Sequence, residues 1–315
     1  MSKCATFEEE WEKKGDMKSI IIYFSLTGNT RKVAYAVHNG VNQRVERCDI
    51  STFKKAEKSR LVEYDLLIFG SPVWGGVPPN VMRFVDTIPS LKKKHCAVFC
   101  THGGSPESFF PLMIGKLEKK GLSVVGFKGW YGSVYGPAAP TPYLTDGHPD
   151  EIDLEEAEEF GKEIAELSQK IYDGKIRFKM AALKMEKAPR TSLDRPVPRL
   201  NTKKCRYPSC SLCMNYCPVG AIDLSVSPHV FAGRCCFCYF CEMICPEGAI
   251  EVDYSAYAEV FRRNARDKLE KVLEEAEKEG TFRRLVPLDK VGWDTPCYRV
   301  HSKHPRYIIP DEDID

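Results

Sequence analysis

Cys205-x4-Cys210-x2-Cys213-x3-Cys217-Pro218 and Cys235-x2-Cys238-x2-Cys241-x3-Cys245-Pro246 are two cysteine ladders in the second half of this 315-residue chain. Both close with the same sequence, Cys-Pro-x-Gly-Ala-Ile. The last three cysteines of the second ladder each stand 28 residues after their counterparts in the first, so the stretch is an internal repeat. Fourteen cysteines in 315 residues are too dilute for a disulfide scaffold, and this spacing indicates metal binding.

Iron–sulfur clusters and zinc are the two kinds of metal site that such ladders can build. Paired Cys-x2-Cys units do form zinc sites. Two Cys-Pro endings within a 28-residue repeat favour iron–sulfur clusters instead. In the x2, x2, x3-Pro pattern, three nearby sulfurs face one cluster, and the cysteine before proline ligates the other cluster.

The stretch resembles the bacterial-type ferredoxins that carry two [4Fe–4S] clusters. The resemblance implies one cluster on Cys205, Cys210, Cys213 and Cys245, and a second on Cys235, Cys238, Cys241 and Cys217. The first arm departs from the family, because four residues separate Cys205 from Cys210 where two are usual. The loop must bulge for Cys205 to reach its cluster, and failure would leave a three-iron cluster or a labile iron. Cys236 is out of register and is predicted to be spare.

The N-terminal half is predicted to alternate strands and helices. The predicted strands span residues 18–24, 65–70, 96–100 and 124–127, and the predicted helices span residues 32–38, 81–88, 109–117 and 151–172. The first three strands each lead into a loop rich in Gly, Ser or Thr before a helix. In a parallel open sheet these loops meet at the carboxyl edge, where ligands bind.

The turn after the first strand, Ser25-Leu26-Thr27-Gly28-Asn29-Thr30, has the residues of an anion site. Gly28 lets the backbone bend, the hydroxyls can donate hydrogen bonds, and a helix N-terminus presents free N–H groups. A plain capped turn is the alternative. The turn is neither a Walker loop, since no Gly-Lys-Ser/Thr follows, nor a dinucleotide fingerprint, which needs three spaced glycines.

Taken together, these loops resemble those of the flavodoxin family over residues 18–173. The resemblance implies a doubly wound parallel α/β sheet of order 2-1-3-4-5 and a bound FMN. It assigns the phosphate to the loop of Ser25, Leu26, Thr27, Gly28, Asn29 and Thr30. It places the flavin ring between the loop of Pro72, Val73, Trp74, Gly75 and Gly76 and the loop of Thr101, His102, Gly103, Gly104 and Ser105. Many flavodoxins have a stacking tyrosine where this chain has His102, so the ring is expected to be more exposed on that side.

Composition and charge exclude several classes of protein. The chain is 43% hydrophobic and 29% charged, as in ordinary soluble proteins. A formal net charge of +2 argues against a general nucleic-acid binder. No apolar run approaches the roughly 18 residues of a membrane span, and the N-terminus has no signal-peptide core. We therefore expect a cytoplasmic protein, and thiolates that hold iron suit a reducing, anaerobic cell.

The domain organisation follows from these segments. We expect an N-terminal extension (1–17), the flavodoxin-like domain (18–173), a basic, proline-containing linker (174–200), a small α+β ferredoxin domain (201–253) and a C-terminal helix with an extended tail (254–315). The linker basic residues Lys184, Lys187 and Arg190 either neutralise the preceding acidic helix or dock an acidic partner. The helix over residues 254–279 has an apolar stripe that is expected to pack on a neighbouring domain or subunit.

The whole chain resembles flavodoxin–ferredoxin fusion proteins, which implies electron transfer between FMN and two [4Fe–4S] clusters and onward to an unidentified redox partner. Two alternatives are a flavin-dependent reductase of a small molecule such as a quinone, and an electron-donating activator of a metalloenzyme. No acid–base pair or nucleophile constellation identifies a catalytic residue. A homodimer that brings the two kinds of cofactor together across subunits is a further expectation.

Overall fold

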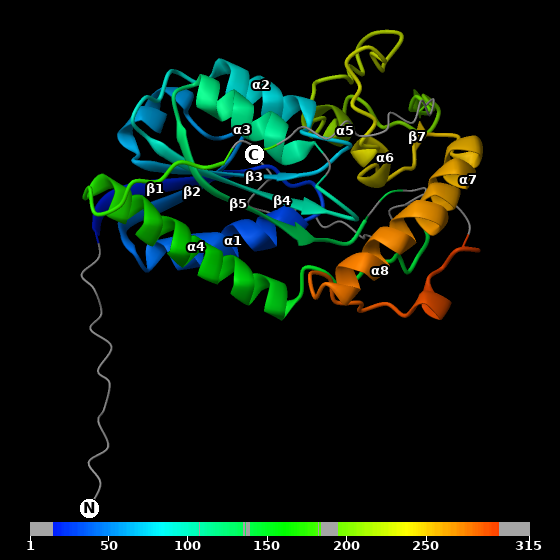
Figure 1. Ribbon diagram of the computed structural model, residues 1–315. Helices are drawn as coiled ribbons and strands as arrows, with labels where there is room; N and C mark the ends of the chain where they lie inside the picture. Colours follow the sequence, from blue (N-terminus) through cyan, green and yellow to red (C-terminus); the bar gives the residue numbers. More distant parts are fainter. Residues whose placement is uncertain are drawn as a thin grey trace, which may run out of the picture.

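The computed structural model describes residues 15–106, 108–134, 136, 139–181, 183 and 195–295. The first half forms a five-stranded parallel sheet of order β2-β1-β3-β4-β5 (Figure 1), which confirms the predicted flavodoxin-like order. The strands are β1 (Gly15–Tyr23), β2 (Val45–Thr52), β3 (Leu66–Pro72), β4 (His95–His102) and β5 (Ser123–Tyr131).

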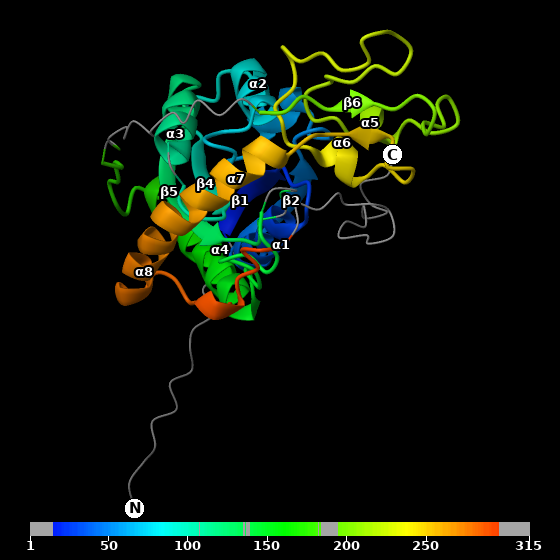
Figure 2. The same ribbon diagram turned by 90° about the vertical axis from the view of Figure 1, so that its right-hand side faces the viewer.

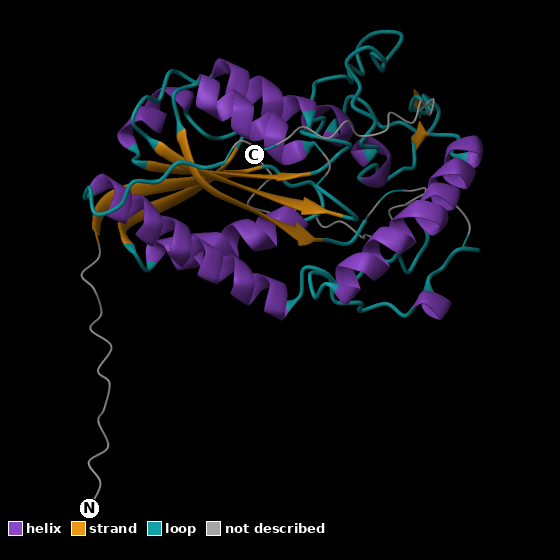
Figure 3. Ribbon diagram, in the orientation of Figure 1, coloured by secondary structure: helices purple, strands orange, loops and turns teal. Residues whose placement is uncertain are grey.

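Helices cover both faces of the sheet, as Figure 3 shows by colour. They are α1 (Asn29–Asn42), α2 (Pro79–Thr87), α3 (Phe109–Lys119) and α4 (Glu151–Tyr172), with a 3₁₀ turn at Lys58–Glu63. Helices α1 and α4 contribute to the core on one face, and α2 and α3 to the core on the other. The central strands are apolar on both sides because both faces are covered: Ile21 and Ile68, aligned in register, face α1 and α4, whereas Ile22 and Phe69 face α2 and α3.

Helix α4 has the predicted bounds, and two neighbouring aspartates of the chain cap its N-terminus. Asp150 accepts a hydrogen bond from the N–H of Asp153, and the Asp153 carboxylate accepts one from the N–H of Asp150. The helix crosses α1 closely: a Cβ on Gly161 would lie 2.3 Å from the Val37 carbonyl oxygen, so only glycine fits there. This contact holds the helix that starts at the first loop firmly against the domain.

Strand β2 is the element of the sheet whose position the sequence did not reveal. It lies at the sheet edge beside β1, and Val45 and Cys48 are buried while Glu46 and Arg47 are exposed. An edge strand with so many half-exposed residues lacks the apolar run that reveals β1, β3 and β4.

The cysteine segment folds as two similar halves. The short helix α5 (Leu212–Asn215) of the first ladder corresponds to α6 (Phe240–Met243) of the second. Strands β6 (Arg199–Leu200) and β7 (Ile250–Glu251) pair antiparallel through Leu200 and Ile250, and Ile222 forms an equivalent bridge to Val230. The repeat in sequence is therefore also a repeat in structure.

The predicted C-terminal helix contains α7 (Ser255–Asn264), a π-helical turn (Ala265–Leu269) and α8 (Glu270–Lys278). Its apolar stripe packs on the first domain of the same chain. Leu273 and Ala265 share a core cluster with Tyr143 and Leu144, which lie in the connection between β5 and α4. Figure 2 shows α7 and α8 lying across the end of the sheet, at its carboxyl edge.

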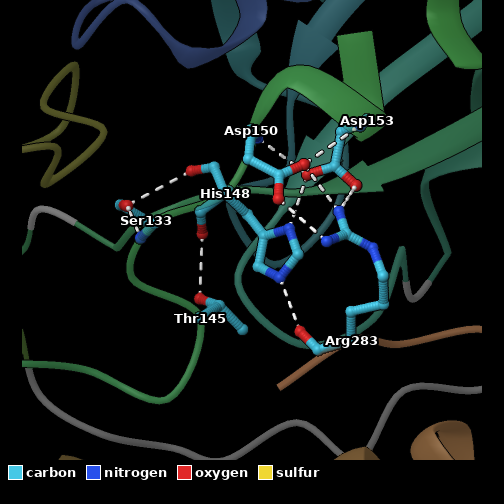
Figure 4. Close-up of polar contacts among 8 residues, drawn as sticks. Ser133, Thr145, His148, Asp150, Asp153 and Arg283 are labelled. Carbon is cyan, nitrogen blue, oxygen red and sulfur yellow. Dashed lines mark hydrogen bonds and ion pairs between the residues drawn. The ribbon is translucent and has the colours of Figure 1, made fainter. Parts of the chain in front are cut away.

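A partly buried ionic cluster ties the segment after α8 to the start of α4 (Figure 4). His148 Nδ1 lies 2.5 Å from an Asp153 carboxylate oxygen, and its Nε2 lies 2.7 Å from the Arg283 carbonyl oxygen. The Arg283 guanidinium donates to Asp150 at 2.6 and 2.8 Å and to Asp153 at 3.1 Å. We call His148, Asp150, Asp153 and Arg283 the clasp.

No helix within the described part of the chain is long and apolar enough to cross a membrane. The linker residues Lys184, Lys187 and Arg190, and the end of the predicted tail beyond residue 295, lie outside the described residues. Expectations for those segments stay predictions.

Candidate functional site

A cavity of about 290 Å³ opens at the carboxyl edge of the sheet, where the predicted loops converge. Its first wall comes from Ser25, Leu26, Thr27, Asn29, Thr30, Pro72, Val73, Trp74, Gly75, Thr101, His102 and Gly103. The structure thus brings together all of the predicted FMN-loop residues except Gly28, Gly76, Gly104 and Ser105, which belong to the same loops without lining the cavity.

The first loop presents a helix N-terminus to this cavity. Gly28 has a φ of +93°, a left-handed conformation that glycine adopts without strain, and its N–H donates to Ser25 Oγ at 3.1 Å. Among the described residues, no side chain caps the start of α1, so its first N–H groups remain free for an anion. The Thr30 hydroxyl hydrogen-bonds with the Thr101 hydroxyl at 2.7 Å, which joins the first and third loops.

The second loop places Trp74 at the cavity. The Val73 N–H donates to the Thr101 carbonyl at 2.9 Å, and the Trp74 N–H donates to the Gly76 carbonyl at 3.0 Å. The Trp74 ring packs edge-on against Phe24, with ring centroids 5.3 Å apart. These contacts hold the indole at the cavity, where an aromatic neighbour of a flavin ring was expected.

The third loop carries a buried, neutral histidine. Burial lowers the pKa of His102 to about 4, so its imidazole is uncharged at neutral pH. Within the described part of the chain, its Nδ1 has no hydrogen-bond partner. A buried polar atom of this kind is normally satisfied by a partner, and a bound ligand can provide one.

The flavin ring was expected to be more exposed on the side of the third loop, but in the structure this side of the cavity is covered. Tyr257 and Phe261 of α7 also line the cavity, and a Cβ on Gly104 would lie 2.4 Å from Leu269 Cδ1. The helix that follows the cysteine segment therefore covers this side. No local sequence pattern could reveal this contact, because more than 150 residues separate the third loop from α7.

The cavity has further walls that the sequence reasoning missed. The connection after β5 contributes Gly132, Ser133, Val134, Gly136 and Ala139, and the C-terminal half contributes Arg195, Phe237, Cys238, Tyr239, Phe240 and Met243. The Gly- and Pro-rich composition of this connection was the one feature of the sequence that could have indicated its place in the cavity wall. Cys238 is the important addition, because it is also a predicted cluster ligand.

The four cysteines predicted for one cluster lie around a second, much smaller cavity of about 20 Å³. This outer set is Cys205, Cys210, Cys213 and Cys245. The longer first arm bulges as expected: the Ser209 N–H donates to the Arg206 carbonyl at 2.8 Å, which closes a turn between Cys205 and Cys210. Arg206 in turn forms an ion pair with Glu247 at 2.5 Å, next to Cys245.

The other predicted ligands, Cys217, Cys235, Cys238 and Cys241, form the inner set. Burial raises the pKa of the Cys241 thiol, and the neighbouring Cys213 of the outer set raises it further, as do Cys217 and Cys235. Cys238 is half-buried, and it lies in the wall of the larger cavity. Cys236 lines neither cavity, but a hydrogen bond with the Cys238 side chain lowers the pKa of its thiol to about 7. That Cys236 is spare stays a prediction.

Backbone N–H groups donate to four of these sulfurs in a repeated pattern. Ala221 donates to Cys217 and Ala249 to Cys245, each at 3.2 Å. Tyr207 donates to Cys205 and Phe237 to Cys235, each at 3.4 Å. Equivalent sulfurs of the two ladders thus have equivalent donors, which is the arrangement that orients and stabilises metal-bound thiolates.

The two cysteine sets have the chemistry of a metal site. Burial, together with nearby Cys245 and Cys205, raises the pKa of Cys213 to about 12. The pKa is raised likewise for the thiols of Cys235, Cys238 and Cys241, and a coordinated metal compensates the charge of such thiols by deprotonating them outright. The donor set therefore fits soft, thiolate-bound metal such as iron in a cluster.

The chemistry of the residues that line the larger cavity likewise fits FMN. Free N–H groups at the start of α1 suit a phosphate, and Trp74 suits an aromatic ring. The buried His102 Nδ1, without a partner among the described atoms, suits a ligand with its own polar groups.

Comparison with known proteins finds relatives for the first half of the chain. The profile of the family described as flavodoxin domain matches residues 20–120. A protein of Archaeoglobus fulgidus named NAD(P)H dehydrogenase (quinone) is 31% identical over 193 positions, covering 48% of this chain and 97% of that protein. An uncharacterized protein of Methanocaldococcus jannaschii is 31% identical over 155 positions, covering 47% of this chain and 98% of that protein. A solved flavodoxin from the domain Archaea is similar at 24% identity with a TM-score of 0.38, covering 49% of this chain and 99% of that one.

Proposed function

The chain belongs to the flavodoxin family through its N-terminal half, and from this we propose that it transfers electrons between FMN and two [4Fe–4S] clusters. One observation carries the proposal. Cys238, a proposed cluster ligand, lines the same cavity as Trp74 and His102 of the flavin loops. The two kinds of site thus share a wall, so an electron passes between them without crossing solvent.

When bound, FMN supplies two-electron chemistry and each cluster supplies one-electron chemistry, so two clusters together hold the two electrons that one flavin exchanges. The protein binds the phosphate with Ser25 to Thr30 at the start of α1. Trp74 and His102 orient the ring from the second and third loops. The buried His102 stays neutral and adds no positive charge beside the ring.

We propose the outer and inner sets as the ligands of the two clusters. Donation from the N–H groups of Ala221, Ala249, Tyr207 and Phe237 orients the thiolates and spreads their negative charge. Cys238 of the inner set lines the flavin cavity, whereas the outer set surrounds the smaller cavity, next to the exposed residues 206–209. We propose that the outer cluster is the one that exchanges electrons with a redox partner protein.

Anaerobic purification with iron, sulfide and FMN measured on the same sample tests the proposal. We expect about eight irons and eight sulfides for each FMN, as two [4Fe–4S] clusters require. About seven irons would mean that Cys205 does not ligate and that one cluster holds three irons. Bound zinc without sulfide would contradict the cluster proposal outright.

A flavin-dependent reductase of a small molecule is the second candidate. It is supported by the names of two relatives, both NAD(P)H dehydrogenase (quinone), from Archaeoglobus fulgidus and Sinorhizobium fredii. Stopped-flow oxidation of the reduced protein separates the candidates. Rapid oxidation by a water-soluble quinone, with none by ferredoxin or flavodoxin carriers, would favour the reductase. The reverse result would favour the carrier.

A further inference from the structure

The flavin cavity is built from two parts of the chain that are far apart in sequence. Loops of the first domain line part of it, and residues 237–240 of the second cysteine ladder line another part. The two parts also touch at the phosphate loop, where Leu26 packs against Phe240 and Met243. The cysteine segment is thus seated directly on the loops that the family uses for FMN.

The part of the cavity wall that the cysteine segment forms is rich in aromatic side chains, whereas the third loop is not. The third loop offers His102, Gly103, Gly104 and Ser105, with no aromatic side chain among them but the imidazole. Phe237, Tyr239 and Phe240 line the cavity from the cysteine segment. Trp74 lines the cavity from the first domain, so both parts of the chain contribute aromatic groups to it. A planar ring bound in contact with aromatic groups gains buried area and favourable ring–ring contacts.

The backbone that carries these aromatics is unusual. Phe237 has a φ of +55° and Tyr239 a φ of +56°, both in the left-handed region that bulky residues rarely adopt. Each such residue strains the backbone, and this strain persists where the surrounding structure imposes it. Here the Phe237 N–H donates to Cys235 Sγ at 3.4 Å, so the cysteine loop itself holds the aromatic residue in place.

Tyr239 adds a polar feature to the same wall. Its side chain is 5% exposed, and its hydroxyl has no hydrogen-bond partner among the described residues. The ring packs against Tyr254, with centroids 5.0 Å apart, which fixes its position. A buried hydroxyl without a partner, in the wall of a cavity that fits a polar ligand, suits a contact to that ligand.

We propose that Phe237, Tyr239 and Phe240 form the outer wall of the FMN site, so that retention of flavin mononucleotide depends on the folded cysteine segment. The inference rests on the proposed function for the identity of the ligand. It adds that the ferredoxin segment is part of the flavin-binding site as well as an electron acceptor. Loss of the clusters then releases the flavin, because the cysteine loop that holds the wall is no longer anchored.

The repeat provides a matched control for the test. Tyr207 and Phe237 are equivalent: each is the second residue after the first cysteine of its ladder, and each donates its N–H to that cysteine. Phe237 lines the flavin cavity, whereas Tyr207 is 40% exposed and lines neither cavity. Replacing either ring by a methyl group keeps the backbone donor.

The full-length protein is freed of FMN under anaerobic conditions and titrated with FMN while flavin fluorescence is measured. We expect Phe237→Ala to raise the dissociation constant about tenfold or more, which corresponds to about 1.4 kcal/mol, and Tyr207→Ala to leave it unchanged. Iron and sulfide contents are measured on the same samples. Equal FMN affinity of the two variants, with iron retained, would overturn the inference.

A second measurement covers the case in which Phe237→Ala does not retain iron. The rate of FMN release from the wild-type protein is compared before and after iron is removed by a chelator. We expect release to become at least about tenfold faster, and an unchanged rate would contradict the proposed wall. A wild-type protein that binds no FMN, or binds FMN without iron, would contradict the proposed function itself. The two failures are therefore distinguishable.

Discussion

Cys205 is the residue on which the number of cluster ligands depends. Two extra residues in its arm are absorbed by the turn that Ser209 closes onto Arg206, so Cys205 still lies with Cys210, Cys213 and Cys245 around the outer cavity. The sulfur also accepts a hydrogen bond from Tyr207, as its counterpart Cys235 does from Phe237. The local geometry thus resembles that of the regular arm despite the insertion.

We predict that Cys205→Ser lowers the iron content by about one to four atoms per chain, because the outer cluster becomes a three-iron cluster or is lost. Iron analysis with electron paramagnetic resonance of the oxidised protein measures this, since a three-iron cluster is paramagnetic in that state. Cys236→Ser is the control and should keep the full iron content. A full iron count in Cys205→Ser would show that this cysteine is not a ligand.

His148 is the residue in the clasp whose charge changes near neutral pH. Both of its ring nitrogens face oxygens that accept hydrogen bonds, the Asp153 carboxylate and the Arg283 carbonyl, so both must carry protons. Burial alone lowers the pKa of His148, but these hydrogen bonds outweigh burial and leave the pKa raised. Asp150 and the Arg283 guanidinium complete the charged surroundings.

We therefore predict that the clasp stabilises the fold most at acidic pH. A raised pKa in the folded state contributes stability that is complete below the unfolded value of about 6.5 and is lost as pH rises through the folded value. His148→Gln should lower the free energy of unfolding by about 1.5–3 kcal/mol at pH 5.5, and by less at pH 8.5. Denaturant unfolding of both proteins at the two pH values measures this. A difference that grows with pH would contradict the protonated state.

Helices α7 and α8 act as one element that connects the cysteine segment to the first domain. Leu273 is fully buried among residues that include Tyr143 and Leu144, whereas its neighbour Val272 is 44% exposed. The stripe predicted from sequence, at Tyr257, Phe261, Ala265, Leu269, Val272 and Ala276, is thus mostly an intramolecular interface. Its Val272 position is wrong, because Leu273 takes the buried place after the π-helical turn. The π-helical turn between α7 and α8 lies where Leu269 meets Gly104 of the third loop.

We predict that Leu273→Ala destabilises the protein by about 2–5 kcal/mol, the usual cost of removing a buried leucine side chain. Val272→Ala should change stability by less than about 0.5 kcal/mol, because that side chain is largely in solvent. Urea unfolding followed by circular dichroism compares the two variants. Equal effects would mean that the helix is not docked on the first domain in solution.

The elements that could be predicted from sequence are those with a strong local signal. The apolar runs of β1, β3 and β4 and the capped, amphipathic α4 have such signals, and their predicted bounds differ from the observed ones by three residues or fewer. Strand β2 has no such signal, because an edge strand needs little apolar surface. The π turn was likewise hidden, since its residues continue the helical spacing of α7 and α8.

At the scale of the whole molecule, the two halves of the chain build one site. The flavin-loop residues were predictable because each loop follows its own strand. The wall of Phe237, Tyr239 and Phe240 was not, because it depends on how the second ladder docks on a loop some 200 positions away. The spacing of the cysteines was visible in the sequence, but their position relative to the flavin cavity required the tertiary structure.

We predict that electron transfer between flavin and clusters occurs within one chain. Cys238 and the flavin loops of a single chain already share a wall, so no second subunit is needed to bring them together. After rapid photoreduction, the rate of redistribution between flavin and cluster absorbance should not change when the protein concentration is raised about tenfold. A rate proportional to concentration would indicate transfer between chains, as the expected dimer would require.

The position of the aromatic wall late in the sequence also has a consequence for synthesis. A ribosome makes the chain from its N-terminus, so the sheet and its loops emerge well before residues 237–261. At about 5–20 residues per second, roughly 90 further residues take on the order of ten seconds. During that interval the nascent first domain holds a half-open cavity, accessible from the side that the finished protein covers. The order of translation therefore gives a ligand entry to its loops before the last part of the chain closes over them.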